Sequence, residues 1–196
     1  ENMSLPENCD QKTDEELVSL ALKDQDYFLY IMKRYTRRLL GYIIRMSGLS
    51  EEDAEDLLQD VFIKVYRNLN NFDQTQKFSS WIYSIARNQA ISNFRKLKSR
   101  PKSVIWDNDD EFLKNISSNF SLETELDGNL NQEMIERVLS ALDYKYKEVL
   151  ALKFIEGHDY KEIADIIKKP MGTVATLINR AKRKFKEEFK KQNIKL

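Results

Sequence analysis

Apolar residues recur every three or four positions through most of this chain, and this spacing constrains the fold more than any other feature. The clearest case spans residues 54–69, where apolar side chains fall at offsets 0, 3, 4, 7, 8, 11 and 15. These offsets form one stripe along an α-helix, whereas a strand would alternate with a period of two. Only five glycines and three prolines occur in 196 residues, which disfavours a fold rich in turns. The sequence therefore predicts an all-α protein.

Local start and stop signals divide the first half of the chain into three helices. Ser, Thr or Asp before an apolar stripe predicts a helix start, and Gly after it predicts a helix end. The first ten residues carry no such pattern and are expected to form a frayed tail. The expected elements are a helix from Thr13 to about Met46 closed by Gly48, a helix from Ser50 to Leu69, a loop from Asn68 to Lys77, and a helix from Ser79 or Ser80 to about Lys98.

The second half begins with a long stretch that lacks any period. Residues 101–131, which begin at Pro101, are rich in Ser, Asn and Asp and predict a linker. Helical patterns return at Gln132, so the chain divides into modules 13–100 and 132–192. The later signals are a stripe from Met134 to Leu142, a helix around Val149–Ile155 stopped by Gly157, a short helix opened by the capping pair Asp159 and Glu162 and closed by Pro170, and a final helix from Thr173 to about Gln192.

Charged residues are balanced in number but occur in blocks. The chain has 32 basic and 32 acidic residues. Residues 61–100 carry eight basic residues and one acid, and residues 134–196 carry fifteen and nine, while residues 101–133 carry two and eight. Any one block is explained equally well as a solvated helix face. Two basic segments separated by an acidic one favour two modules that face a polyanion.

The composition excludes several classes of function. One cysteine, Cys9, and one histidine, His158, provide neither a disulfide framework nor a metal site. The chain has no glycine-rich phosphate loop and no apolar run near the roughly 20 residues of a membrane span. We therefore expect no catalytic residues, no cofactor, no metal and no membrane insertion. The absence of a secretory leader favours a cytoplasmic protein.

The last two helices form a helix-turn-helix pattern. A short capped helix, a break at residues 168–171 and a longer basic helix match the geometry of that DNA-binding motif. The second helix has the diameter that fits a major groove, and its Arg and Asn side chains are suited to base edges. The alternative is an ordinary helical hairpin with a basic solvent face.

Three stretches of the sequence carry motifs of a known family. They are DAEDLLQDVF at 53–62; FD at 72–73 with KFSSWIYSIARN at 77–88; and IEGHDYKEIA at 155–164 with PMGTV at 170–174 and NRAK at 179–182. In this order they resemble region 2.2, regions 2.3 and 2.4, and region 4 of bacterial sigma factors. Two modules joined by an acidic linker, without a helical module between them, resemble the extracytoplasmic-function (group IV) class of these proteins. The resemblance covers residues 13–100 and 132–192.

The resemblance implies core RNA polymerase as a partner, through the β′ clamp helices for the first module and the β flap for the second. Six acids in residues 51–60 suit a basic partner. Leu57 and Phe62 are equally well explained as core residues. The resemblance places this contact at Asp53, Asp56, Leu57, Gln59, Asp60 and Phe62.

The resemblance also implies promoter DNA as a partner, with the −10 element of the non-template strand held by the loop near 70–78 and by the following helix. Aromatic faces and cations are what a single strand requires, although Trp81 is at least as well explained as core. The residues implied are Asn71, Lys77, Trp81, Arg87, Asn88 and Arg95. The linker resembles a connector that runs through the polymerase cleft, with a plain tether as the alternative.

The final helix departs from the usual pattern of the family. Many relatives carry Gly-Thr-Val-Lys-Ser-Arg where this chain has Ala175 and Leu177 in place of the Lys and Arg. We therefore expect weak −35 readout, either of an AT-rich element or with help from another DNA-targeting protein. An anti-sigma partner is common in the family, and no residue here indicates one. The upstream contacts implied are Thr173, Thr176, Asn179, Arg180 and Arg183.

Together these features predict a transcription initiation factor that lends promoter recognition and −10 melting to RNA polymerase. The alternative is a stand-alone helix-turn-helix regulator that binds duplex operators without polymerase, with the first module as a sensor or dimerisation bundle.

Overall fold

The computed structural model describes residue 9, residues 11–99 and residues 132–192, without the side chains of residues 95–99 and 132. Contacts divide the chain into two compact units, residues 1–93 and 94–196. Every regular element in the described residues is helical, which confirms the all-α prediction. The expected linker, 101–131, lies outside the described residues.

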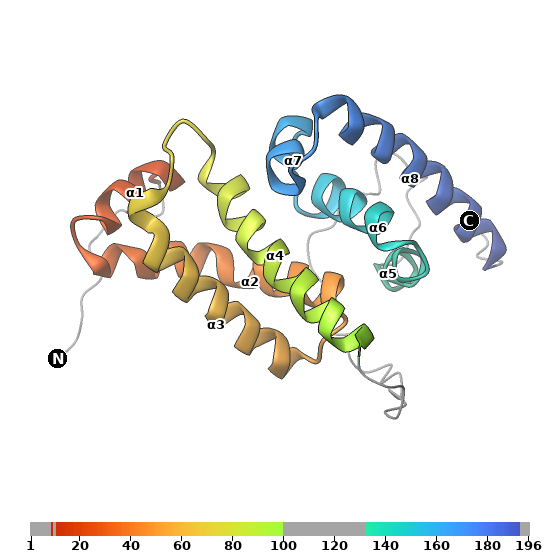
Figure 1. Ribbon diagram of the computed structural model, residues 1–196, viewed down its shortest axis with the longest axis horizontal. Coiled ribbons are helices and arrows are strands. Elements are labelled where there is room, and N and C mark those ends of the chain that lie inside the picture. Colours follow the sequence, from red (N-terminus) through yellow and green to blue (C-terminus); the bar gives the residue numbers. More distant parts are fainter. Residues whose placement is uncertain (1–8, 10, 100–131, 193–196) are drawn as a thin grey trace. The chain divides into compact units, whose positions relative to one another are not determined.

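The first four helices are labelled α1–α4 in Figure 1. Short 3-10 helices η1 and η2 precede α2 and follow α3. The bounds are α1 Asp14–Ala21, η1 Gln25–Tyr27, α2 Phe28–Ser47, α3 Glu51–Asn68, η2 Leu69–Asn71 and α4 Phe78–Ser99. The caps expected at the first two starts are confirmed. Thr13 and Glu16 form a capping box, Ser50 accepts a hydrogen bond from the Asp53 amide, and Gly48 ends α2 at φ 69°.

The expectation of one helix from Thr13 to Met46 is wrong. The chain leaves α1 at Leu22, and the amides of Lys23 and Asp24 both donate to the Leu20 carbonyl at 2.9 Å. Asp24 then accepts from the Asp26 amide at 3.0 Å and starts η1. Aspartate side chains compete with helical bonding in this way. The apolar period continued across the break, so the period alone concealed it.

Aromatic rings form much of the core of the first unit. The rings of Tyr35 and Phe78 meet edge to face at 5.8 Å between centroids, and those of Tyr42 and Tyr83 at 5.3 Å. Cys9 lies in the stretch expected to be frayed, yet it is 3% exposed, and its carbonyl accepts from the Lys12 amide. The expectation of a frayed tail is therefore wrong at Cys9.

The second unit carries the remaining helices, α5–α8 (Figure 1). Their bounds are α5 Gln132–Ser140, α6 Tyr144–Leu150, the π-helix η4 Ala151–Ile155, α7 Tyr160–Ile167 and α8 Met171–Lys191. The predicted stop at Gly157 is confirmed by its φ of 77°, and the capping box of Asp159 and Glu162 is confirmed by bonds of 2.7 and 2.8 Å.

The start predicted for the last helix, at Thr173, is wrong. Helix α8 begins at Met171, and the carbonyl of Pro170 accepts from the amides of Thr173 and Val174 at 2.9 and 3.1 Å. Proline fixes φ near its helical value and suits a helix start. The short helix α7 ends earlier, where Lys168 takes the left-handed conformation at φ 54°. Pro170 therefore opens the second helix of the motif and does not close the first.

Candidate nucleic-acid and polymerase interface

Helix α3 presents a row of acids on its exposed face. Its buried stripe runs from Ala54 to Val65 and packs against the core, where α3 contacts α2. The side chains of Asp53, Asp56, Gln59 and Asp60 are exposed. Leu57 and Phe62 are only 6% and 5% exposed, so they support α3 from the core side. A partner that approaches this face meets carboxylates first.

The site predicted from the sequence does not include two exposed apolar residues on the same helix. Ile63 is 48% exposed and Tyr66 is 45% exposed. They follow Asp56 and Asp60 at helical spacings of three, six, seven and ten residues, which keeps all four on one side of α3. Ile63 falls outside the offsets of the buried stripe, and that is the sequence signal that could have found it. We call this side of the helix the α3 face. It carries Asp53, Asp56, Gln59, Asp60, Ile63 and Tyr66.

The loop between η2 and α4 is shaped by its own side chains. Asp73 accepts hydrogen bonds from the amide and hydroxyl of Thr75 at 2.9 and 2.8 Å. These bonds hold the pKa of the exposed Asp73 carboxyl below its ordinary value, the amide bond having the larger effect. The Gln76 amide donates to the Asp73 carbonyl at 3.0 Å. Residues 72–77 therefore carry a defined turn beside the start of α4.

Trp81 lies half-buried next to this loop. Its ring centroid is 5.2 Å from that of Phe72 and 5.7 Å from that of Phe78. Phe72 and Phe78 are themselves buried and meet at right angles, 5.4 Å apart. The sequence is compatible with Trp81 either as a core residue or as a stacking surface. In the structure the indole is partly core, because buried rings fix one part of it while another part stays accessible.

Helix α4 does not use the caps expected for it. Its first residue is Phe78, so Ser79 and Ser80 lie inside the helix, and Ser80 is buried. The carbonyl of Lys77 accepts from the Trp81 amide at 3.3 Å. The Phe78 amide donates to Oε1 of Glu15, on α1, at 3.0 Å. The expected serine caps are therefore wrong, because a carboxylate from another helix takes their place.

The remaining −10 candidates lie on η2, on the loop and on α4. Asn71, Lys77 and Asn88 are exposed, and Arg87 is half-buried. The side chain of Arg95 lies outside the described residues. Lys77 and Trp81 flank the start of α4, while Arg87 and Asn88 both lie on the third turn of the helix.

The start of α8 offers few groups that can reach DNA bases. Thr173, Thr176, Asn179 and Arg180 are exposed, whereas Ala175 and Leu177 are half-buried. The hydroxyl of Thr176 donates to the Gly172 carbonyl at 2.9 Å. This bond leaves the Thr176 oxygen only as an acceptor. Thr173 keeps a hydroxyl donor near the start of α8, and Asn179 and Arg180 are the next side-chain donors along the helix.

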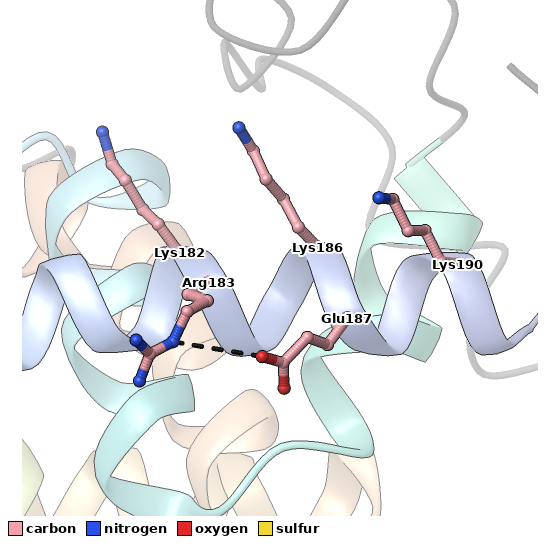
Figure 2. Close-up of a pocket in the computed structure, with 5 residues that line it drawn as sticks. All are labelled: Lys182, Arg183, Lys186, Glu187 and Lys190. Carbon is pink, nitrogen blue, oxygen red and sulfur yellow. Dashed lines mark ion pairs between the residues drawn. The ribbon is translucent and has the colours of Figure 1, made fainter.

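The second half of α8 carries a concentrated positive charge. Figure 2 shows the ammonium groups of Lys182, Lys186 and Lys190 on one side of the helix. Arg183 lies on another side, with its Nε 3.9 Å from a Glu187 oxygen, and Lys184 Nζ lies 2.9 Å from the other oxygen. The hydrogen bond with Glu187 raises the pKa of the exposed Lys184, and the same bond lowers the pKa of Glu187. The lysine side of α8 is therefore the more strongly positive one.

Among the described residues, no group of three or more His, Cys, Asp or Glu side chains could hold a metal ion. No helix in that part of the chain is both long and apolar enough to cross a membrane. The arrangement is one of surfaces: an acidic face on α3, an aromatic surface at the start of α4 and a basic helix α8.

Comparison with known proteins assigns both modules. The model of Sigma-70 region 2 matches residues 31–100, and that of Sigma-70, region 4 matches residues 132–185. The ECF RNA polymerase sigma factor SigW of Bacillus subtilis (strain 168) is 31% identical over 176 residues, which cover 85% of this chain and 91% of SigW. The ECF RNA polymerase sigma-E factor of Escherichia coli (strain K12) is 32% identical over 183 residues, covering 88% and 92%.

Solved structures share the fold. CnrH, in complex with the cytosolic domain of CnrY, aligns with a TM-score of 0.65 at 22% identity, over 90% of this chain and 96% of that one. The sigma factor RpoE of Bartonella quintana, in complex with the anti-sigma factor NepR, aligns with a TM-score of 0.62 at 22% identity, over 83% and 96%.

Proposed function

The chain belongs to the extracytoplasmic-function sigma factors of bacterial RNA polymerase, and we propose that it brings core RNA polymerase to promoter DNA and opens the −10 element there. Three surfaces divide this work. The α3 face binds the polymerase, the start of α4 captures a single strand, and α8 binds upstream duplex. Chemistry at the polymerase active site stays with the polymerase.

The α3 face is the proposed contact with the β′ clamp helices. Asp53, Asp56, Gln59 and Asp60 present charge and hydrogen-bond acceptors, and Ile63 and Tyr66 add apolar area. Charge steers such an encounter, while buried apolar contacts at its centre supply much of the affinity. Leu57 and Phe62 act from beneath, because their side chains are buried. The second unit is the proposed contact with the β flap.

The loop 72–77 and α4 are the proposed site for the non-template strand of the −10 element. The accessible part of Trp81 offers a face on which an unstacked base can rest. Lys77 and Arg87 supply cations for the backbone, while Asn71 and Asn88 supply hydrogen bonds. Capture of unstacked bases offsets the few kcal/mol that unstacking costs at each step. Melting then needs no chemical energy source.

Upstream recognition by α8 is proposed to be weak. Asn179 is suited to adenine, and Arg180 and Arg183 lie further along the helix, where backbone contacts are easier to reach than base edges. Thr173 and Thr176 contribute short polar contacts. An additional DNA-bound protein would supply the missing upstream anchoring. An anti-sigma protein is a further proposed partner, since the related RpoE structure holds one.

The observation that carries the proposal is the pairing of an exposed acidic α3 face with a half-exposed Trp81 in one unit. The test is a pull-down of the full chain with core RNA polymerase, followed by DNA binding with and without the polymerase. Co-purification, with promoter binding that needs the polymerase, supports a sigma factor. Tight binding of the chain alone to duplex operators would favour the stand-alone regulator.

A further inference from the structure

The N-terminus of α4 is capped from a distant part of the chain. Glu15 and Phe78 are 63 residues apart in sequence, yet Oε1 of Glu15 accepts from the Phe78 amide at 3.0 Å. Free amides at a helix N-terminus need an acceptor, and a negative charge there is favoured by the helix dipole. The residue that precedes the helix is Lys77, whose side chain has no acceptor. Glu15 therefore fills a role that the local sequence leaves vacant.

Helix α1 holds Glu15 firmly in this position. The neighbouring Asp14 binds Arg34 Nη1 at 2.6 Å through one oxygen and the hydroxyl of Tyr35 through the other. Burial first, and the Asp14 charge second, raise the pKa of Tyr35, so its hydroxyl remains a donor. The Tyr35 ring in turn packs against the Phe78 ring. Two adjacent acids of α1 thus tie α2 and the first residue of α4 together.

The loop 72–77 lies between two fixed points. At one end the Phe72 amide donates to the Leu69 carbonyl at 3.2 Å, and at the other Glu15 holds Phe78. Trp81 lies one turn beyond that second point. A displacement of Phe78 would move both the loop and the aromatic surface. A carboxylate in direct contact with DNA would repel phosphate, so the charge of Glu15 fits a role behind the surface.

We propose that Glu15 is a positioning residue for the single-strand site, acting through the start of α4. This inference rests on the proposed function, because it concerns the site where the −10 strand is captured. It assigns a promoter-binding role to α1, whose residues 14–21 precede the 31–100 match to Sigma-70 region 2.

The chain offers a matched control in the next residue. Glu16 is also an acid on α1, but it accepts from the Thr13 amide at 2.7 Å and so caps α1 itself. We would compare Glu15→Ala, Glu15→Gln and Glu16→Ala in the full chain. The readouts are affinity for a single-stranded −10 oligonucleotide across salt concentrations, affinity for core polymerase, melting temperature, and hydrogen exchange at the Phe78 amide.

Glu15→Ala should lose Phe78 amide protection and weaken oligonucleotide binding by about five- to tenfold. The salt slope should stay unchanged, because no phosphate contact is lost. Core-polymerase affinity should also stay unchanged. Glu15→Gln should recover most of the affinity through its amide oxygen. Glu16→Ala should lower the melting temperature yet bind the oligonucleotide within about twofold of the parent chain.

Two results would overturn the positioning role. One is oligonucleotide binding by Glu15→Ala equal to that of the parent. The other is a parallel loss of oligonucleotide binding, core binding and melting temperature in both alanine variants, which indicates general destabilisation. A parent chain that binds single and double strands equally well, with or without polymerase, would instead refute the proposed function and this inference with it.

Discussion

Trp81 keeps part of its ring accessible because Phe72 and Phe78 hold the rest. Base stacking on an aromatic side chain contributes ~1–3 kcal/mol per base. We therefore expect Trp81→Ala to weaken binding of a single-stranded −10 oligonucleotide by about that amount, and Trp81→Phe to retain most of the affinity. Fluorescence anisotropy measures both. Tyr66→Ala is the matched control, since it removes an exposed ring from the α3 face and should leave oligonucleotide binding unchanged.

Ala175 and Arg183 test how α8 meets duplex DNA. A good bidentate pair with a base contributes ~1–3 kcal/mol of discrimination, and Ala175 can make none. We expect Arg183→Ala to weaken binding about equally across upstream sequences, and Ala175→Lys to strengthen it. Competition binding against a panel of upstream duplexes checks both. Losses of several kcal/mol for single base changes within one fixed hexamer would contradict weak readout.

Helix α3 acts as an element through the charge of its exposed face. Asp56→Arg combined with Asp60→Arg should abolish co-purification with core polymerase while the helical circular dichroism signal stays intact, because both side chains point to solvent. The same charge change at Glu187 and Glu188, on α8, is the control for added positive charge, and the intact α3 face should keep co-purification in place. Wild-type binding by the α3 double variant would show that this helix is not the polymerase contact.

The turn between α7 and α8 stores strain at Lys168. This residue adopts φ 54°, in the left-handed region that glycine occupies without steric cost. Lys168→Gly should raise the free energy of unfolding by about 0.5–1 kcal/mol, whereas Lys169→Gly, at a position without positive φ, should lower it. Calorimetric unfolding of the full chain measures both changes. A lower stability for Lys168→Gly would mean that the lysine side chain makes a stabilising contact.

Elements whose signals are local could be predicted from the sequence. The capping boxes at Thr13 and Asp159 and the stops at Gly48 and Gly157 each join residues a few positions apart. The break after Leu22 was hidden because the apolar period resumes in phase after it. The start of α4 was expected at Ser79 or Ser80, one or two residues late, and its cap could not be predicted, since Glu15 lies 63 residues away.

In the candidate site, too, features set by local sequence could be predicted, and features set by tertiary packing could not. The acids of α3 and the basic residues of α8 were evident from charge pattern alone. The exposure of Ile63 and Tyr66 depends on which side of α3 packs inward. The half-buried state of Trp81 depends on two phenylalanines that the loop brings beside it. Hydrophobic periodicity therefore predicts which side of a helix is apolar, whereas tertiary packing determines which side chains stay exposed to solvent.

We propose that this chain gives core RNA polymerase the ability to open a promoter. The most direct measurement is transcription by core polymerase plus the full chain from one promoter, prepared as duplex and as a template already melted at the −10 element. Transcription from the duplex should require the chain, and Trp81→Ala should lose far more activity on the duplex than on the melted template. Equal losses on both templates, or duplex transcription that does not depend on the chain, would contradict it.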